Sequence, residues 1–94
     1  MPHILNYQPG GDHYRTQPIQ PVEYNEANKL SHQEGDIVKR ITRHNEPSGK
    51  GIQDLRKIIH STLIVMWTQY GIDDEHIAGL YVKLADRMKE YEQD

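Results

Sequence analysis

Residues 52–70 read IQDLRKIIHSTLIVMWTQY, and this stretch decides the fold. Its apolar residues recur at intervals of three and four, which predicts one amphipathic helix that stops before Gly71. From Leu63 to Trp67 the apolar residues are continuous, so this end of the helix should be central or lie in a subunit interface. Trp67, together with Tyr70 and Tyr81, is expected in the core or in that interface.

Two further helices are predicted on the N-terminal side. Proline is favoured in a first helical turn, so Pro21 predicts a short helix over 22–29. Ser31 and Glu34 form a capping box, which predicts the start of a second helix over 32–45. The glycine-rich break at 46–51 then separates it from the central helix.

A last helix is predicted over 74–92, with Asp73 as its N-cap. No strand-like alternation competes with these helical patterns. The fold class is therefore all-α, a small helical domain of three to four helices. The apolar face of the last helix is predicted to hold Ile77, Leu80, Tyr81, Leu84, Met88 and Tyr91.

The chain divides into an extended N-terminal arm, 1–21, and a helical domain, 22–94. The arm holds four of the five prolines and shows little periodicity. Ninety-four residues suit one domain with a modest core, and the absence of cysteine excludes disulfides and thiolate chemistry. Such a chain often gains buried surface by self-association, so a homo-oligomer is expected.

Net charge argues against a general nucleic-acid binder, because the chain carries −3 rather than a basic excess. The longest apolar run, Leu63 to Trp67, is far too short to span a membrane. The N-terminus shows no signal-peptide pattern, so the protein is expected to stay in the cytoplasm where it is made.

Cationic side chains cluster on the predicted helix 32–45. Lys39 and Arg43 lie four residues apart, opposite the apolar side, and Arg40 and His44 flank that side. The pattern fits a solvated charged face, and it also fits a grip for phosphate oxygens. Both interpretations stay open on spacing alone.

The loop that follows adds to the phosphate interpretation. Gly49-Lys50-Gly51 leads straight into a helix, whose first N–H groups and positive dipole end attract anions, and Lys57 lies within two turns. The spacing is not that of a Walker loop, and a flexible connection explains the glycines equally well. In the arm, residues 11–15 concentrate polar and aromatic groups.

Catalytic and metal-binding motifs are absent from the sequence. The six histidines show no paired spacing of the HxxxH kind, and no serine or threonine stands in a nucleophile motif. Asp73, Asp74 and Glu75 read as complements to a helix dipole. No catalytic residue, metal ligand or cofactor is assigned.

Several segments together resemble a family of small phage proteins, catalogued partly as a domain of unknown function and partly as phage nucleotide kinase-like. Their order and spacing resemble the family more than any single motif does. The segments are Asp12-His13-Tyr14, Ile19-Gln20-Pro21, Glu26-Ala27, 34–43 and 54–58.

The resemblance implies that the protein binds a nucleotide, is encoded by a phage and acts in the cytoplasm of the infected bacterial host. Asp36, Arg40 and His60 depart from the family pattern, which puts a shared substrate in doubt. By position, the resemblance marks His13, Tyr14, Lys39, Arg43, Asp54 and Lys57 as candidates. With the pattern-based residues added, the ligand-binding candidates are His13, Tyr14, Arg15, Lys39, Arg43, His44, Lys50, Asp54 and Lys57.

Three functions follow as hypotheses. The first is a phage-encoded protein that sequesters a nucleotide without turnover, such as a host immune signal, and so acts against host defence. The second is a deoxynucleoside monophosphate kinase that uses Mg²⁺ and the carboxylates of Glu34, Asp36 and Asp54. The third is a helical adaptor for another protein. In the first, Lys39 and Arg43 should be replaceable without loss of the fold.

Overall fold

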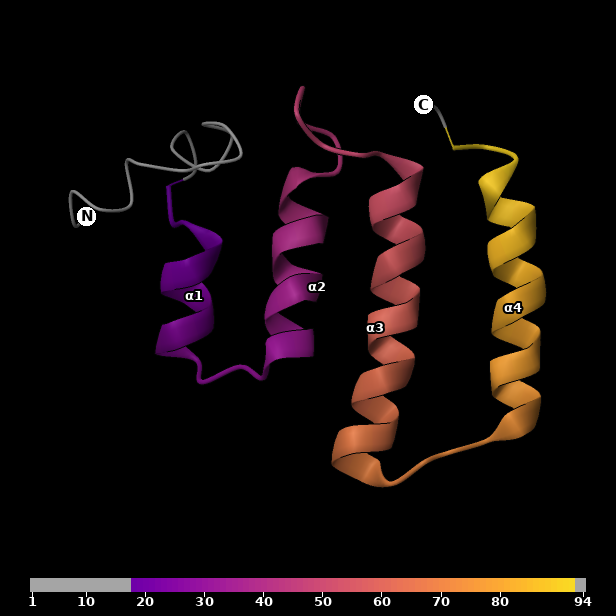
Figure 1. The fold of residues 1–94 in the computed structure, drawn as a ribbon. Helices are drawn as coiled ribbons and strands as arrows, with labels where there is room; N and C mark the ends of the chain where they lie inside the picture. Colours follow the sequence, from indigo (N-terminus) through magenta and orange to yellow (C-terminus); the bar gives the residue numbers. More distant parts are fainter. Residues whose placement is uncertain (1–17, 93–94) are drawn as a thin grey trace.

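The computed structural model describes residues 18–92, and these form four helices with no strand among them. The helices are α1 (Pro21–Ala27), α2 (His32–Arg43), α3 (Ile52–Tyr70) and α4 (Glu75–Lys89). They lie side by side in a single row with alternating direction (Figure 1). The all-α prediction is confirmed.

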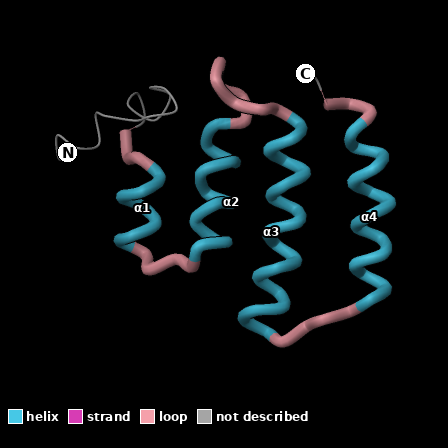
Figure 2. The backbone as a smooth tube through the Cα atoms, viewed as in Figure 1, coloured by secondary structure: helices cyan, strands magenta, loops and turns pink. Residues whose placement is uncertain are grey.

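The molecule is flat, with extents of 46 × 32 × 18 Å. The contact between α2 and α3 is the most extensive, and the contact between α3 and α4 is the least. Figure 2 shows that the α2–α3 loop and the segment after α4 lie along the same edge of the row, at neighbouring helix ends. This arrangement brings residues far apart in the sequence to one edge of the molecule.

The start of α2 is held by the predicted capping box. The hydroxyl of Ser31 accepts a hydrogen bond from the Glu34 N–H at 3.3 Å, and the Glu34 carboxylate accepts one from the Ser31 N–H at 2.9 Å. These bonds satisfy two backbone donors that a helix start leaves free. The predicted end at residue 45 is two residues too late, because α2 ends at Arg43.

The boundaries of α3 agree with the sequence prediction. Gly71 ends the helix in the left-handed conformation, with φ 69°, and donates to the Trp67 carbonyl at 2.9 Å. The N-cap of α4 is Asp74, one residue after the predicted Asp73. The Asp74 carboxylate accepts hydrogen bonds from the N–H groups of His76 and Ile77.

The buried positions are not the expected ones. Gln20, Asp54 and Ser61 are buried polar residues, whereas Ala85 is the only buried residue with an aliphatic chain apart from Pro21 in the part that the structure describes. Large apolar side chains that were predicted for the core, for a subunit interface or for the apolar face of the last helix are exposed in the single chain. They are Trp67, Tyr70, Leu80, Leu84 and Tyr91.

The reason for this exposure is geometric. A single layer of helices covers each helix only at its flanks, so the two broad faces of α3 and α4 have no second layer over them.

The sequence predicts no segment that spans a membrane. No helix within residues 18–92 is both long and apolar enough to cross a bilayer.

We predict that Ser31→Ala lowers the free energy of unfolding by about 1 kcal/mol, because it removes the hydroxyl that caps α2. Thermal denaturation should show a melting temperature lower by about 4–8 °C. Thr62→Ala is the control, since Thr62 is exposed inside α3. Equal melting temperatures for the two variants would contradict a stabilising cap.

Candidate functional site

The α2–α3 loop, residues 44–51, folds back against the end of α2. Backbone bonds run from Glu46 N–H to Arg43 O at 2.8 Å and from Gly51 N–H to His44 O at 3.1 Å. The approach at Gly49 is so close that a Cβ there would lie 1.9 Å from the Arg43 carbonyl oxygen. Only glycine therefore fits position 49, and the loop is held rather than loose.

The last loop residue sets the direction of α3. Gly51 has φ 58° and ψ −127°, a conformation essentially restricted to glycine. It precedes Ile52 at the start of α3, whose N-cap makes no side-chain hydrogen bond. The two glycines that the sequence offered as signs of flexibility or of an anion site thus have a definite structural role.

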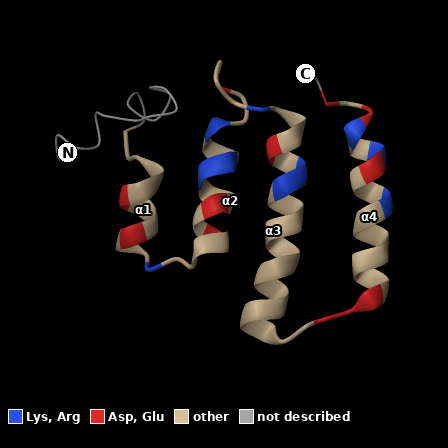
Figure 3. Cartoon of the chain, in the orientation of Figure 1, with Lys and Arg blue, Asp and Glu red and all other residues tan. Residues whose placement is uncertain are grey.

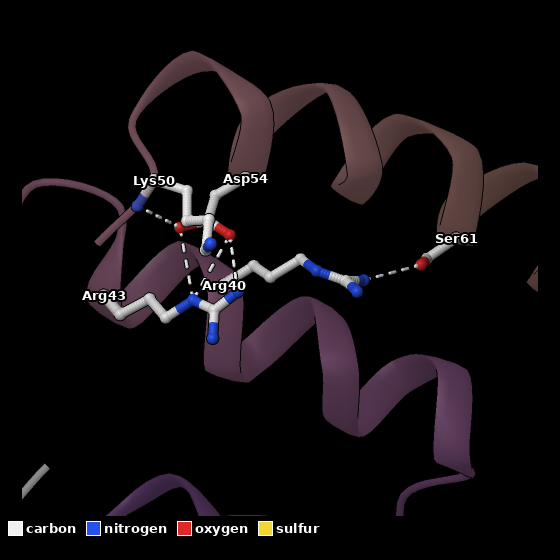
Figure 4. Close-up of polar contacts among 5 residues, drawn as sticks. All are labelled: Arg40, Arg43, Lys50, Asp54 and Ser61. Carbon is white, nitrogen blue, oxygen red and sulfur yellow. Dashed lines mark hydrogen bonds and ion pairs between the residues drawn. The ribbon is translucent and has the colours of Figure 1, made fainter. Parts of the chain in front are cut away.

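A buried ion pair joins the end of α2 to the first turn of α3 (Figure 4). Arg43 Nη2 lies 2.7 Å from Asp54 Oδ1, and Arg43 Nε lies 3.2 Å from each carboxylate oxygen. The Asp54 side chain is fully buried, whereas a quarter of the Arg43 side chain is exposed. Such a two-nitrogen contact is the strong form of an arginine–carboxylate bond.

The same carboxylate also holds the loop. The Lys50 N–H donates to Asp54 Oδ2 at 2.9 Å, so Asp54 connects α2, the loop and α3 (Figure 4). Burial by itself raises the pKa of the Asp54 carboxyl. The hydrogen bonds from Arg43 and Lys50 and the charges of Arg43 and Arg40 outweigh burial, so the pKa lies below its usual value.

A second polar contact ties α2 to α3 two turns further along. Arg40 Nη1 lies 3.4 Å from the hydroxyl of Ser61, which is buried (Figure 4). The two arginines thus reach across to α3, and each is only partly exposed to solvent. These polar groups lie within the α2–α3 contact, the most extensive in the fold.

A hollow of about 700 Å³ lies beside the loop. Its wall combines residues of the loop with the first residues of α3 and with the segment after α4. Lys50 and Tyr91 are exposed, and the Tyr91 ring is 65% accessible. The lining residues include His44, Ser48, Lys50, Gln53, Tyr91 and Glu92.

Glu92 brings an acidic group to this wall, but the group is paired. Its carboxylate binds the guanidinium of Arg56, which closes the chain after α4 onto α3. The hydrogen bond from Arg56 lowers the pKa of the Glu92 carboxyl, and the charges of Arg56, Lys89 and Lys57 add to this effect. Positive residues of α2 and α3 gather toward this end of the molecule (Figure 3).

The structure therefore divides the residues predicted from the sequence. His44 and Lys50 line the hollow, whereas Arg43 and Asp54 bind each other. Lys39 is exposed on α2 and does not line the hollow, and Lys57 is half-buried on α3. His13, Tyr14 and Arg15 lie outside the described residues.

The engagement of Arg43 corrects one expectation. The sequence interpretation treated Arg43 as an outward-facing cation that is replaceable without loss of the fold, but its guanidinium neutralises a buried carboxylate. Removing it would leave Asp54 buried without its counter-ion. Arg43 is therefore part of the scaffold beside the hollow.

Three residues of the hollow were not recognised from the sequence. Gln53 carries no motif, Tyr91 was assigned to an apolar face, and Glu92 was not singled out. The pair between Arg56 and Glu92 spans 36 residues. No local spacing signals a contact over that separation, so these residues could be found only from the fold.

The other two acidic residues considered for Mg²⁺, Glu34 and Asp36, each bind a residue within one turn of the chain. Asp36 lies 3.4 Å from the ring of His32 one turn earlier, and Glu34 caps its own helix. Within residues 18–92, no group of three His, Asp or Glu residues could together hold a metal ion.

Comparison with protein-family models, with curated proteins and with solved structures finds no match to this chain.

We predict that Arg43→Ala lowers the free energy of unfolding by about 3 kcal/mol, because the buried Asp54 carboxylate loses its counter-ion. Lys39→Ala is the matched control, since it removes an exposed cation from the same helix and should change stability by less than about 0.5 kcal/mol. Chemical denaturation measures both. Equal effects would contradict a structural role for Arg43.

We also predict acid sensitivity that depends on Asp54. Its folded-state pKa is lowered, so its contribution is complete above the unfolded pKa of about 3.9 and is lost as pH falls through the folded pKa. Asp54→Asn should be less stable than wild type at neutral pH, and the two should converge in acid. A difference in unfolding free energy that stays constant down to acid pH would refute this assignment.

Proposed function

We propose that this protein binds a nucleotide, without turnover, in the hollow beside the α2–α3 loop. The observation that carries the proposal is the hollow itself, which combines nucleotide-like size with cationic and aromatic side chains. Its volume of about 700 Å³ falls in the range of small-molecule sites, about 300–1,000 Å³. It also opens beside the start of a long helix.

The phosphate end of the ligand would lie at the loop. Lys50 is an exposed ammonium on the wall, and His44 adds an imidazole ring whose N–H can donate a hydrogen bond to a phosphate oxygen. The positive dipole end of α3 favours an anion at the same place. Pairing with Arg56 neutralises Glu92, which would otherwise repel a phosphate.

The base would stack on Tyr91. This ring is 65% accessible and lines the same hollow as Lys50, so an aromatic face and a cation are available to one ligand. Stacking on an exposed aromatic ring is worth about 1–3 kcal/mol per base. Gln53, half-buried at the wall, adds an amide for hydrogen bonds to the base or sugar.

Binding without turnover is favoured over phosphoryl transfer by the state of the carboxylates. A kinase would use Glu34, Asp36 and Asp54 to hold Mg²⁺. In the structure each of these already has a partner within the fold, and none lines the hollow.

The resemblance to small phage proteins supports a biological setting for this proposal. A binding protein in the cytoplasm of an infected bacterium would act as a sponge that removes a nucleotide from solution. A cyclic or ADP-ribose-like signal of host immunity is the class of ligand that makes sequestration useful to a phage. We propose that it acts as a homo-oligomer.

One observation favours a second candidate, a helical adaptor for another protein. The broad faces of α3 and α4 carry Trp67, Leu80 and Val82 with more than half of each side chain exposed. Large exposed apolar surfaces mark interaction sites. The adaptor role needs no small-molecule ligand, so a ligand-binding assay separates the two.

We predict that a cognate nucleotide raises the melting temperature by about 11–22 °C at a hundredfold excess over its Kd, since such binding contributes about 2.7 kcal/mol. A panel of nucleoside monophosphates, cyclic nucleotides and ADP-ribose, with inorganic phosphate for comparison, should be screened by thermal denaturation. Heating the complex should then release the nucleotide intact. No shift with any compound would overturn the proposal and favour the adaptor.

The location of the site is tested with single lysine variants. Lys50→Ala should weaken binding at least about tenfold, because it removes the cation from the hollow. Lys83→Ala removes an exposed lysine of α4 that does not line the hollow, so its affinity should equal wild type. If Lys39→Ala abolished binding and Lys50→Ala did not, the ligand would lie on the outer face of α2.

A further inference from the structure

A second concave surface lies at the opposite end of the α3–α4 pair, where the two helices diverge toward their connection. This groove has a volume of about 410 Å³ and is lined mainly by apolar side chains. It shares no residue with the hollow at the α2–α3 loop. Its lining includes His60, Ile64, Trp67, Ile72, Ala78 and Val82.

Two residues of the groove are exposed to a degree that is unusual for their type. Trp67 is 59% accessible and Val82 is 58% accessible. An indole ring that exposed leaves on the order of 150 Å² in water. From Ile58 to Ile72 the chain carries no Lys, Arg, Asp or Glu. A long uncharged stretch beside exposed aromatic and aliphatic groups is typical of the centre of a protein interface.

The two ends of this face differ in charge, because the start of α4 carries acidic residues alone whereas the other end carries cations together with carboxylates. Asp73, Asp74 and Glu75 lie at the start of α4, and the first two line the groove. Lys57 and Lys89 lie toward the other end, close enough together for both to act on the Glu92 carboxyl. Figure 3 shows acidic residues where α4 begins and both basic and acidic residues toward its end, where Lys89 lies 4.0 Å from Asp86 and Arg87 lies 3.8 Å from Glu90.

We propose that a second copy of this chain covers the α3–α4 groove, with its own α3–α4 face turned antiparallel. A two-fold axis through the middle of the face places the acidic end of one copy over the end of the other that carries Lys57 and Lys89. The uncharged centre then meets an identical uncharged centre. The face is thus self-complementary, as a symmetric dimer interface must be.

The size of the face suits such a dimer. Nineteen residues make α3 about 28 Å long, and two adjacent helices are about 20 Å wide. A stable interface needs about 800 Å² per partner, which side chains on a face of these dimensions can supply. The lack of a second layer over α3 and α4 in one copy is thereby explained. This proposal deepens the proposed self-association and does not depend on nucleotide binding.

The test is the mass of the full chain in solution, measured by light scattering over a dilution series. Wild type should be a dimer or a multiple of it. Val82→Glu places a charge in the groove and should raise the dimer Kd at least about thirtyfold. Ile41→Glu is the control, because Ile41 is 51% exposed on α2 and lies outside the groove.

Fluorescence of the single tryptophan gives a second readout that needs no variant. Trp67 lines the groove, so its emission should shift to shorter wavelength as the protein is concentrated. Emission independent of concentration, from wild type of dimeric mass, would place the contact elsewhere. Wild type of monomeric mass at all concentrations would overturn both this surface and the proposed oligomer.

The antiparallel orientation is tested by exchanging charges. Lys89→Glu should weaken the dimer, and the double variant Glu75→Lys/Lys89→Glu should restore it, because each changed residue then meets an opposite charge on the other copy. A double variant weaker than Lys89→Glu alone would refute the orientation. Val82→Glu that remains as dimeric as Ile41→Glu would refute the groove as the contact surface.

Discussion

The ion pair between Arg43 and Asp54 is the contact on which the rest of the fold depends. It joins the last residue of α2 to the first turn of α3, and the same carboxylate accepts the Lys50 N–H. The loop between the two helices is thereby fixed, and its backbone forms one wall of the hollow. Arg43, which the sequence suggested as a ligand-binding residue, binds the Asp54 carboxylate of the protein itself. The same carboxylate accepts the Lys50 N–H and so positions Lys50 beside the hollow.

Polar side chains, and not apolar ones, fill two of the buried positions between α2 and α3. Asp54 and Ser61 occupy buried positions that aliphatic side chains fill in an ordinary helical domain, whereas several apolar residues of α3 and α4, among them Trp67, Leu80 and Val82, are exposed. A buried ion pair contributes less net stability than apolar packing of similar volume. The single layer therefore has little core of its own, and a second layer from another copy is the physical consequence that we infer.

Local features of the fold could be predicted from the sequence, and contacts across the fold could not. The bounds of α3 follow from periodicity and from Gly71, and the cap of α2 follows from Ser31 and Glu34, because each depends on neighbours within one turn. Asp73 and Asp74 carry the same carboxylate and are both suitable N-caps, so the sequence predicts the start of α4 only to within one residue. Both members of the central ion pair were identified as candidates, but their pairing was not, since it depends on how the loop returns α3 to α2.

The most direct test of this account is a double-mutant cycle on positions 43 and 54. The free energies of unfolding of Arg43→Ala, Asp54→Ala and the double variant should be measured by chemical denaturation at neutral pH. If the two side chains stabilise the fold through each other, the double variant loses less than the sum of the single losses, with a coupling energy of at least about 1.5 kcal/mol. A coupling energy near zero would show that the pair does not hold α2 to α3, and the account built on it would fail.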